Sequence, residues 1–408
     1  MENPIIIGAG VSALVAAIEL EKAGFSPIIL EASNEIGGRV KTNDFNGLPI
    51  DHGFQVLLTE YPEAKHYLDY TKLDLIQFLP GSVIFKNGKM EKIGDPLRDT
   101  SFLWSTISAK IGSLKDKALI LKLSLTLKRK SIDAIFAEPE MTTNDYLLNF
   151  GFSKEVIHNF FQPFFAGIYL EEDLATSSRM FEFVYKMFGT GFAAIPRVGM
   201  QAIPQQLASQ LKKTEIRFQS PVSKIDEHTI ILASGETFTS DKIIIATDPA
   251  SFFDQKENTN VEWKSCVNLY FASTKPLLKG AIIGLLPGKE NLVNNFHYVD
   301  AIFKPNDNSA ESLLSVTVVK NNSLNEADLI KAVKTELKDL CGIDTGEMVK
   351  MYTINKALPN LNDLKYQPSD ASVKLAPGIF CCGDYLANGS LNAAMASGRM
   401  AAREAIKG

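Results

Sequence analysis

The first thirty residues constrain the fold of this chain more than any other segment. A short β-branched run, Pro4–Ile7, is typical of a buried parallel strand. Apolar residues then recur at helical spacing over residues 12–22, and Gly24 follows as the helix terminator. A second strand is expected over residues 26–30. This order of strand, helix and strand predicts a βαβ unit, and hence an α/β protein with a parallel sheet.

The turn between this strand and helix carries the residues that a phosphate-binding loop requires. Gly8 allows the sharp turn, and Gly10 lacks the Cβ atom that would keep backbone amides away from a pyrophosphate. Ala13 takes the third position of the GxGxx(G/A) fingerprint, where a small side chain lets helix and strand pack closely. The helix N-terminus, with Val11 and Ser12, directs free N–H groups and partial positive charge at the phosphates.

An acidic residue stands at the carboxyl end of the second strand. Glu31 follows Gly10 by 21 residues (31 minus 10), the spacing at which a carboxylate binds ribose hydroxyls and repels a 2′-phosphate. Ala32, next to it, is expected among the cofactor contacts. With strand, helix and acid in register, the segment predicts a dinucleotide site rather than an ordinary glycine turn.

The segment after Glu31, ASNEIGGRVKT, leads into a Gly37-Gly38-Arg39 turn instead of directly into a helix. Two adjacent glycines let the loop fold back over a pyrophosphate. The guanidinium of Arg39 can neutralise phosphate charge. The sequence DHGFQVL follows at residues 51–57.

These motifs resemble the fingerprint of the FAD-dependent amine oxidase, phytoene desaturase and protoporphyrinogen oxidase superfamily, with Ala13 in place of its third glycine. The resemblance implies FAD as the cofactor. It also implies that the backbone of Gly53 and Phe54 runs beside the flavin ring.

The C-terminal segment, GIFCCGDYLANGSLNAAMASGRMAAR at residues 378–403, resembles the ending of the same family. A strand over residues 379–382 carries Gly383 and Asp384 at its carboxyl end, where α/β sheets bind ligands. The resemblance implies that Asp384 bonds a ribityl hydroxyl. A small-residue helix follows over residues 392–406, and its N-terminus at Leu391 and Asn392 is expected to face the flavin and stabilise its reduced form.

Segments between the two ends extend the resemblance, at residues 160–178, 195–211 and 351–360. Alternating strands over residues 220–249 complete the cofactor domain in the family, with the backbone of Val222 beside the adenine.

We therefore expect an α/β fold with a discontinuous, Rossmann-like (GR2-type) FAD-binding domain and a mixed α+β substrate domain that contains a helical subdomain. The FAD domain is predicted to comprise residues 1–75, 201–255 and 366–408. The substrate domain is predicted to comprise residues 76–200 and 256–365, with 101–200 mostly helical.

Composition excludes several kinds of partner. The net charge of -5 and the pI near 5.7 provide no basic field for nucleic acid. The four cysteines form no CxxC pair and no cluster with histidine, so neither a metal site nor a disulfide framework is expected. A cytoplasmic location fits this cysteine usage. No apolar run approaches the roughly 20 residues that cross a bilayer.

The expected function is FAD-dependent dehydrogenation of a bulky, hydrophobic small molecule, by an enzyme like the desaturases or the protoporphyrinogen oxidases. A flavin amine oxidase, a non-redox flavin-dependent isomerase of a polyene and a flavin-bound lipid carrier remain alternatives. A second glycine motif, Gly189–Ala194, is followed by Pro196 and by no helix, so no second nucleotide site is expected. No catalytic residue is assigned, because His52, Tyr270, His297 and Lys356 cannot be ranked from sequence.

Residues 101–130 are basic and rich in leucine, with seven basic residues and one acid. Such a stretch, expected to be helical, can lie in a bilayer interface with Trp104 and Phe102 at headgroup level. The alternative is an ordinary amphipathic helix with solvated lysines. Peripheral membrane contact is therefore a hypothesis to test.

Overall fold

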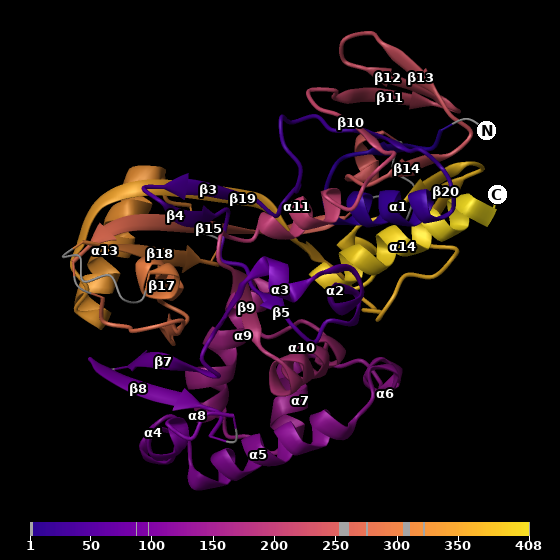
Figure 1. Cartoon of the computed structure of the whole chain (residues 1–408). Helices are drawn as coiled ribbons and strands as arrows, with labels where there is room; N and C mark the ends of the chain where they lie inside the picture. The colour runs from indigo at the N-terminus through magenta and orange to yellow at the C-terminus, as the bar shows by residue number, and fades with distance from the viewer. Residues whose placement is uncertain are drawn as a thin grey trace.

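The computed structural model describes residues 3–86, 88–96, 98–252, 261–274, 276–304, 311–320 and 323–407. The domain boundary expected at residues 255 and 256 lies outside these ranges. Figure 1 shows a part with both chain termini, a second part rich in strands, and a helical part at the opposite end from the termini.

A six-stranded sheet joins the two ends of the chain. Its order is β10-β2-β1-β14-β21-β20, and only β20 is antiparallel to its neighbour among the pairs in this sheet. The strands are β1 Ile5–Ile7, β2 Ile28–Leu30, β10 Glu215–Arg217, β14 Ile243–Ile245, β20 Lys374–Ala376 and β21 Ile379–Cys381. β1 and β21 both flank β14, so the glycine loop after β1 and the Gly383-Asp384 turn after β21 meet at one edge of the sheet.

Helices α1 (Val11–Lys22) and α14 (Leu391–Lys407) lie side by side against this sheet (Figure 1). The two are closest where Gly398 faces α1. A Cβ atom on Gly398 would lie 2.1 Å from the carbonyl oxygen of Ser12 and 3.2 Å from the backbone nitrogen of Ala16. The small-residue spacing of the C-terminal helix therefore brings two helix backbones into contact. The predicted strands and helices of both terminal motifs are present, with ends displaced by one or two residues.

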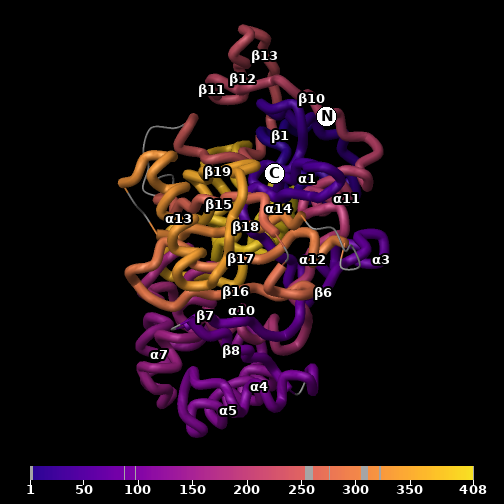
Figure 2. Tube along the Cα trace, turned by 90° about the vertical axis from the view of Figure 1, so that its left-hand side faces the viewer, coloured from indigo at the N-terminus to yellow at the C-terminus, as the bar shows by residue number. Residues whose placement is uncertain are grey.

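A small antiparallel sheet extends from the same part, with strands β11 Val222–Asp226, β12 Thr229–Leu232 and β13 Thr237–Thr239. It lies at the end of the molecule opposite helices α4 and α5 (Figure 2). A short 3-10 turn, Pro249–Ser251, follows β14.

The strand-rich part is built on a seven-stranded sheet of order β19-β15-β18-β17-β16-β7-β8. All neighbours are antiparallel except β16 and β7. The strands are β7 Gly81–Lys86, β8 Lys89–Gly94, β15 Glu262–Ser273, β16 Ile283–Leu285, β17 Val293–Tyr298, β18 Ser312–Val318 and β19 Thr345–Asn360. Helix α13 (Glu326–Cys341) packs its buried leucines and Val333 on one face, and α12 (Val299–Phe303) packs against β18 and β4.

Two smaller sheets connect these parts. One is the hairpin of β3 (Thr42–Phe45) and β4 (Leu48–Asp51). The other joins β5 (Leu57–Leu58), β9 (Ala193–Pro196) and β6 (Leu75–Gln77). In the second sheet, β9 comes from the predicted substrate domain and pairs with β5 of the predicted FAD domain, whereas β6 straddles the boundary expected between residues 75 and 76. Backbone hydrogen bonds between β5 and β9 therefore join the two predicted domains.

The remaining helices lie mostly at the end of the molecule opposite the β11–β13 sheet (Figures 1 and 2). They are α2 Pro62–Tyr67, α3 Tyr70–Leu73, α4 Phe102–Ser108, α5 Leu114–Arg129, α6 Ile132–Ala137, α7 Thr143–Phe150, α8 Lys154–Val156, a π-helix Ile157–Phe161, α9 Gln162–Tyr169, α10 Ser178–Thr190, α11 Ala202–Ala208 and a 3-10 turn Asp384–Leu386. The basic stretch is thus two helices, because Ser113 starts α5 with a capping box to Asp116. The second glycine motif joins the end of α10 to β9 and has no strand-turn-helix geometry.

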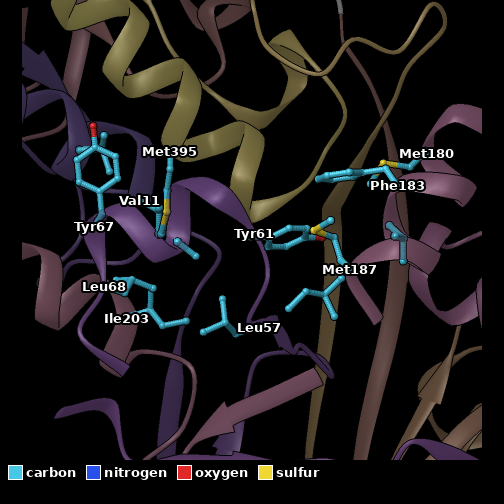
Figure 3. Packing of buried hydrophobic residues seen from close by; sticks show 14 of the residues in the cluster. Val11, Leu57, Tyr61, Tyr67, Leu68, Met180, Phe183, Met187, Ile203 and Met395 are labelled. Atoms are coloured by element: carbon cyan, nitrogen blue, oxygen red, sulfur yellow. The ribbon is translucent and has the colours of Figure 1, made fainter. Parts of the chain in front are cut away.

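One apolar core joins the cofactor-side helices to the helical part. Figure 3 shows Val11 and Met395, from α1 and α14, near Leu57 and Tyr61, with Phe183 of α10 beyond them. The ring centroids of Tyr61 and Phe183 lie 5.6 Å apart in a stacked arrangement. The cofactor-side helices and the helical part are therefore held together by a shared apolar core.

Candidate active site

A single cavity of about 1310 Å³ connects the edge of the six-stranded sheet with helices α4 and α5. Most of the predicted cofactor residues line it. These are Gly8, Gly10, Val11, Ser12, Glu31, Gly37, Gly38, Arg39, Gly53, Phe54, Gly383, Asp384 and Leu391. Ala13 is buried inside α1, and Ala32, Val222 and Asn392 are not on the cavity wall. The sequence motifs from both chain ends thus converge on one space.

The glycine loop opens onto this cavity at Gly10. Gly8 has a φ of +95°, and a Cβ there would lie 2.6 Å from Cγ2 of Thr247. A Cβ on Gly10, in contrast, would meet no atom within 4 Å. Gly38, with a φ of +61°, brings the Gly37-Gly38 turn against Gly10, since its own Cβ would lie 3.3 Å from the Gly10 Cα. The two loops form a cradle that is open at Gly10. A pyrophosphate could approach the backbone amides from this open side.

Glu31 holds the glycine loop in place as well as lining the cavity. Its Oε2 accepts a hydrogen bond from the backbone N–H of Ala9 at 2.7 Å, and its Oε1 accepts one from Ser33 at 2.8 Å. A carboxylate has about four acceptor positions, so lone pairs remain for ribose hydroxyls.

Arg39 and Asp384 contact each other across the cavity wall, which the sequence did not predict. Nη1 of Arg39 donates to Oδ2 of Asp384 at 3.0 Å, and Nη2 donates to Oδ1. Nη1 also donates to the carbonyl of Ala357 at 3.1 Å, and the guanidinium lies over the ring of Trp263. The Asp384 carboxylate raises the pKa of Arg39 against the effect of burial. The two residues, for which separate roles in phosphate and ribityl binding were expected, thus form one bidentate pair.

Two buried polar groups beside this pair test whether the site fits FAD. Among the described residues, the Nε1–H of Trp263 and the hydroxyl of Tyr385 have no hydrogen-bond partner, and both residues line the cavity. Burial holds the pKa of Tyr385 well above its ordinary value, so it is a neutral donor. Unpaired buried donors are costly unless a ligand accepts from them. Together with the cradle at Gly10, they fit a large polar cofactor with many acceptor atoms.

The N-terminus of α14 is positioned at the same site. Leu391, its first residue, lines the cavity. The backbone N–H of Gly383 donates to Oγ of Ser397 at 2.9 Å, which ties the turn after β21 to this helix. Asn392 is fully buried, and its Oδ1 accepts from the backbone N–H of Glu63 at 3.0 Å. The N-terminus of α14, with its partial positive charge, therefore lies at the cavity wall through Leu391, whereas Asn392 does not reach the wall.

The far end of the cavity is apolar and aromatic. Phe160, Phe164, Phe165, Tyr185 and Phe188 line it, and their rings contact one another or neighbouring aromatic rings. One ion pair interrupts this wall. Nζ of Lys264 lies 2.6 Å from Oε2 of Glu171, and both side chains are largely buried.

The four residues that the sequence could not rank as catalytic candidates differ in their position relative to the cavity. His52 lines the cavity and stacks on Tyr352, and Lys356 lines it and pairs with Asp248 at 2.6 Å. Tyr270 and His297 are buried away from its wall. The described parts of the chain contain no cluster of three or more potential metal ligands.

Asp51 has a structural role that the sequence motif alone does not reveal. Its Oδ1 accepts hydrogen bonds from the hydroxyl of Thr42 and from the backbone N–H of Met200 at 3.0 Å. The first bond lies within the β3–β4 hairpin, and the second ties the hairpin to residues 199–201. Complete burial raises the pKa of Asp51 from 3.8 to about 6 despite the two donors. Between these pH values the folded protein holds a proton that the unfolded chain has released, so stability falls as the pH rises, by about 3 kcal/mol in all.

Asp51→Asn should therefore stabilise the protein at neutral pH. The amide Oδ1 can accept the same two bonds, and no charge is buried, so we expect the free energy of unfolding to rise by about 1–2 kcal/mol near pH 7.5. Near pH 4 the gain should vanish, because Asp51 is then protonated in the native state. Urea unfolding at both pH values measures this. Asp226→Asn, at an exposed position, is the control; an equal gain in both variants would contradict the assignment.

The parallel sheet, its glycine cradle and the cavity define a dinucleotide-binding flavoprotein. The chain belongs to the flavin containing amine oxidoreductase family, whose model matches residues 11–406. It is accordingly an FAD-dependent oxidoreductase. It is 24% identical to protoporphyrinogen oxidase 2, chloroplastic/mitochondrial, of Arabidopsis thaliana, over 97% of this chain and 92% of that protein.

Solved structures share the fold across nearly the whole chain. A putative protoporphyrinogen oxidase from Exiguobacterium sp. 255-15 superposes with a TM-score of 0.73 at 16% identity, covering 99% of this chain and 98% of that one. A CLA-producing fatty acid isomerase from P. acnes gives 0.71 at 16% identity, covering 97% and 96%. These likenesses confirm the predicted fold class.

Proposed function

We propose that this enzyme dehydrogenates a bulky apolar molecule in the aromatic end of the cavity, in the manner of a desaturase or a protoporphyrinogen oxidase. The apolar, aromatic lining of the far end of the cavity supports this. The whole cavity, at about 1310 Å³, includes the cradle for the cofactor and exceeds the roughly 300–1,000 Å³ of most small-molecule sites, so it is large enough for a cofactor and a substrate together. FAD, when bound, supplies the acceptor for a hydride from a substrate C–H bond.

In this proposal the residues of the chain bind the cofactor, orient the substrate and shield both from water. The cradle at Gly10 and the donors Trp263 and Tyr385 hold the cofactor. The phenylalanines of α9 and the preceding π-helix exclude water and hold the apolar body of the substrate. An amine oxidase and a flavin-dependent isomerase remain the alternative functions. The isomerase is retained because this chain shares its fold with a fatty acid isomerase.

An anaerobic screen with the holoenzyme tests the proposal. Protoporphyrinogen IX, phytoene and putrescine are each mixed with the protein, and flavin absorbance and products are recorded. Bleaching by an apolar compound and not by putrescine supports the proposal. Bleaching by putrescine alone would favour an amine oxidase, and a rearranged product without net bleaching would favour an isomerase.

Leu121 and Leu125 provide matched variants for this screen. Both are on α5 and similarly exposed, at 45% and 43%, but only Leu121 lines the cavity. Leu121→Trp should narrow the cavity at this wall and lower kcat/KM for the bulky substrate by about tenfold, or about 1.4 kcal/mol, while Leu125→Trp should leave it unchanged. Equal effects of the two would show that substrate does not pass this wall.

We further propose that α4 and α5 rest on a membrane surface, where exposed residues of the two helices also line the cavity. Trp104 and Leu114 are 79% and 73% exposed. Further exposed apolar residues on the two helices are Leu103, Ile107, Leu121 and Leu125. Leu103, Ile107 and Leu121 also line the cavity, so an apolar substrate could pass from lipid to cavity. No described helix is long and apolar enough to cross a bilayer.

The structure corrects the interpretation of the basic residues in this segment. Lys117 donates to the carbonyls of Ile107 and Ala109, and Lys130 pairs with Glu182, so neither is a simple solvated lysine. The exposed basic residues are Lys110, Lys115, Lys122, Lys128 and Arg129. Because these remain available, attraction to anionic lipid is still expected, at about 1 kcal/mol per residue.

Co-sedimentation with vesicles tests the membrane proposal. With phosphatidylcholine vesicles containing about 30% phosphatidylserine, the protein should pellet at low salt and less at high salt. Lys115→Glu combined with Lys128→Glu should reduce the partition coefficient at least about tenfold. Lys279→Glu combined with Lys331→Glu, at exposed positions outside α4 and α5, changes the net charge equally and should have little effect. Negligible pelleting at both salt concentrations would exclude the proposal.

A further inference from the structure

Part of one face of the seven-stranded sheet is polar although it is buried. On β18 the side chains alternate: Leu314, Val316 and Val318 belong to the core beneath α13, whereas Ser315 and Thr317 are directed to the opposite face. All of these side chains are at most 4% exposed. A buried sheet face is normally apolar, since burial of polar groups is unfavourable unless they are hydrogen-bonded.

A network of uncharged side chains satisfies most of this face. Oγ1 of Thr317 donates to Oδ1 of Asn268 at 3.0 Å, and Nδ2 of Asn268 donates to Oγ of Ser315 at 3.2 Å. Nδ2 of Asn295 donates to Oγ1 of Thr317 at 3.4 Å, and Oδ1 of Asn295 accepts from Nδ2 of Asn294 at 2.9 Å. The network thus spans β15, β18 and β17.

Only the edge of this network reaches the cavity. Asn295 and Thr317 line the cavity, and Asn268 and Ser315 do not. An asparagine amide has two N–H donors and two acceptor lone pairs. In the bonds given by the described residues, Asn295 uses one donor and one lone pair. It therefore retains one donor and one acceptor at the cavity wall.

A glycine in α9 fixes the position of this amide. A Cβ on Gly167 would lie 2.8 Å from Nδ2 of Asn294 and 3.1 Å from Oδ1 of Asn295. Glycine thus lets the helix backbone approach the two amides closely, and Asn295 is held between α9 and β18. A rigid polar group in an apolar cavity is typical of a site that orients a ligand.

The network contains no charge. His297, next to Asn295 in the alternation of β17, is buried and uncharged near neutral pH, because burial lowers its pKa to about 3. A carboxylate or an ammonium group at Asn295 would be buried without a counterion, which is strongly unfavourable. A hydroxyl or carbonyl oxygen needs only the donor and acceptor that are present.

We propose that Asn295 and Thr317 form the subsite for an uncharged oxygen, a hydroxyl or a carbonyl, on the otherwise apolar substrate. This rests on the proposed function only in taking the cavity as the substrate site. The two residues orient the substrate by one or two hydrogen bonds, while the phenylalanines hold its apolar body. Fatty acids and free amines are disfavoured at this subsite by their charge.

Equilibrium dialysis of the holoenzyme against four matched probes tests this inference. The probes are retinol, retinal, retinoate and the hydrocarbon axerophthene, held anaerobically in the dark. We expect retinol and retinal to bind about tenfold more tightly than the hydrocarbon, the value of one hydrogen bond, and retinoate to bind no better than the hydrocarbon. Equal affinities for retinol and hydrocarbon, or no binding of any probe by flavin-loaded protein, would overturn the inference.

Variants separate the subsite from the rest of the network. Thr317→Val and Asn295→Leu should abolish the preference for retinol and leave hydrocarbon affinity and FAD content unchanged, whereas Thr317→Ser should keep it. Ser315→Ala is the control, since Ser315 belongs to the network and does not line the cavity. A preference that survives Thr317→Val and Asn295→Leu overturns the assignment. The proposed function is tested separately: it fails if no apolar compound bleaches the flavin in the anaerobic screen.

Discussion

Gly10→Val is expected to yield a folded protein that has lost its flavin. Gly10 caps α1 with φ −76° and ψ 176°, an extended conformation that valine adopts readily. Its added Cβ would meet no protein atom within 4 Å, so the protein itself has room for the side chain. The same space is the open side of the phosphate cradle. A side chain there costs at least about 3 kcal/mol of cofactor affinity, which corresponds to a dissociation constant more than about 100-fold higher.

Two measurements distinguish this outcome from simple misfolding. The flavin-to-protein absorbance ratio of the purified variant should fall to near zero, and added FAD should raise the melting temperature of wild-type protein and not that of the variant. Stripped of flavin, the two proteins should unfold at the same urea concentration. Gly10→Ala should give an intermediate loss. A yellow Gly10→Val protein would show that the pyrophosphate lies elsewhere.

The parts of the site that the sequence predicts well are those in which one short segment determines the geometry. The turn at Gly8 and Gly10, the acid at Glu31 and the start of the last helix at Leu391 each follow from local spacing. Local spacing also predicts a parallel strand before each loop. The pairing of β1 and β21 on opposite sides of β14 then brings the two chain ends together, and here the resemblance to a known family supplied what periodicity could not.

Contacts between distant segments were missed for a common physical reason. Arg39 bonds a residue 345 positions away, Met200 bonds Asp51 at a separation of 149, and Asn295 bonds Thr317 on another strand. Neither the secondary-structure propensity nor the hydrophobic periodicity of one segment predicts which distant side chain it contacts in the fold. Lys130 shows the converse error, since a lysine in a basic stretch looked solvated and is paired with Glu182 of another helix.

Gly398→Ala is expected to destabilise the cofactor-binding part of the chain strongly. The single added carbon would lie 2.1 Å from the carbonyl oxygen of Ser12 and 3.0 Å from its carbon. Both atoms belong to the backbone of α1, so no side-chain rotation relieves the contact, and the two helices must separate. Overpacking typically costs about 1–3 kcal/mol, and we expect about 3 kcal/mol here because the contact is with backbone atoms. The free energy of unfolding in urea should fall accordingly.

The same substitution should also weaken flavin binding, because Ser397, the preceding residue, accepts the hydrogen bond that holds Gly383 at the end of β21. Gly189→Ala is the matched control. Gly189 is also helical, in α10, and a Cβ there meets no atom within 4 Å. Alanine is the better helix former by about 0.5–1 kcal/mol, so this variant should be as stable as wild type or more stable. If both variants lost stability equally, the effect would arise from glycine replacement in general and not from the contact between α1 and α14. If Gly398→Ala were neutral, the two helices would have to be farther apart than the structure places them.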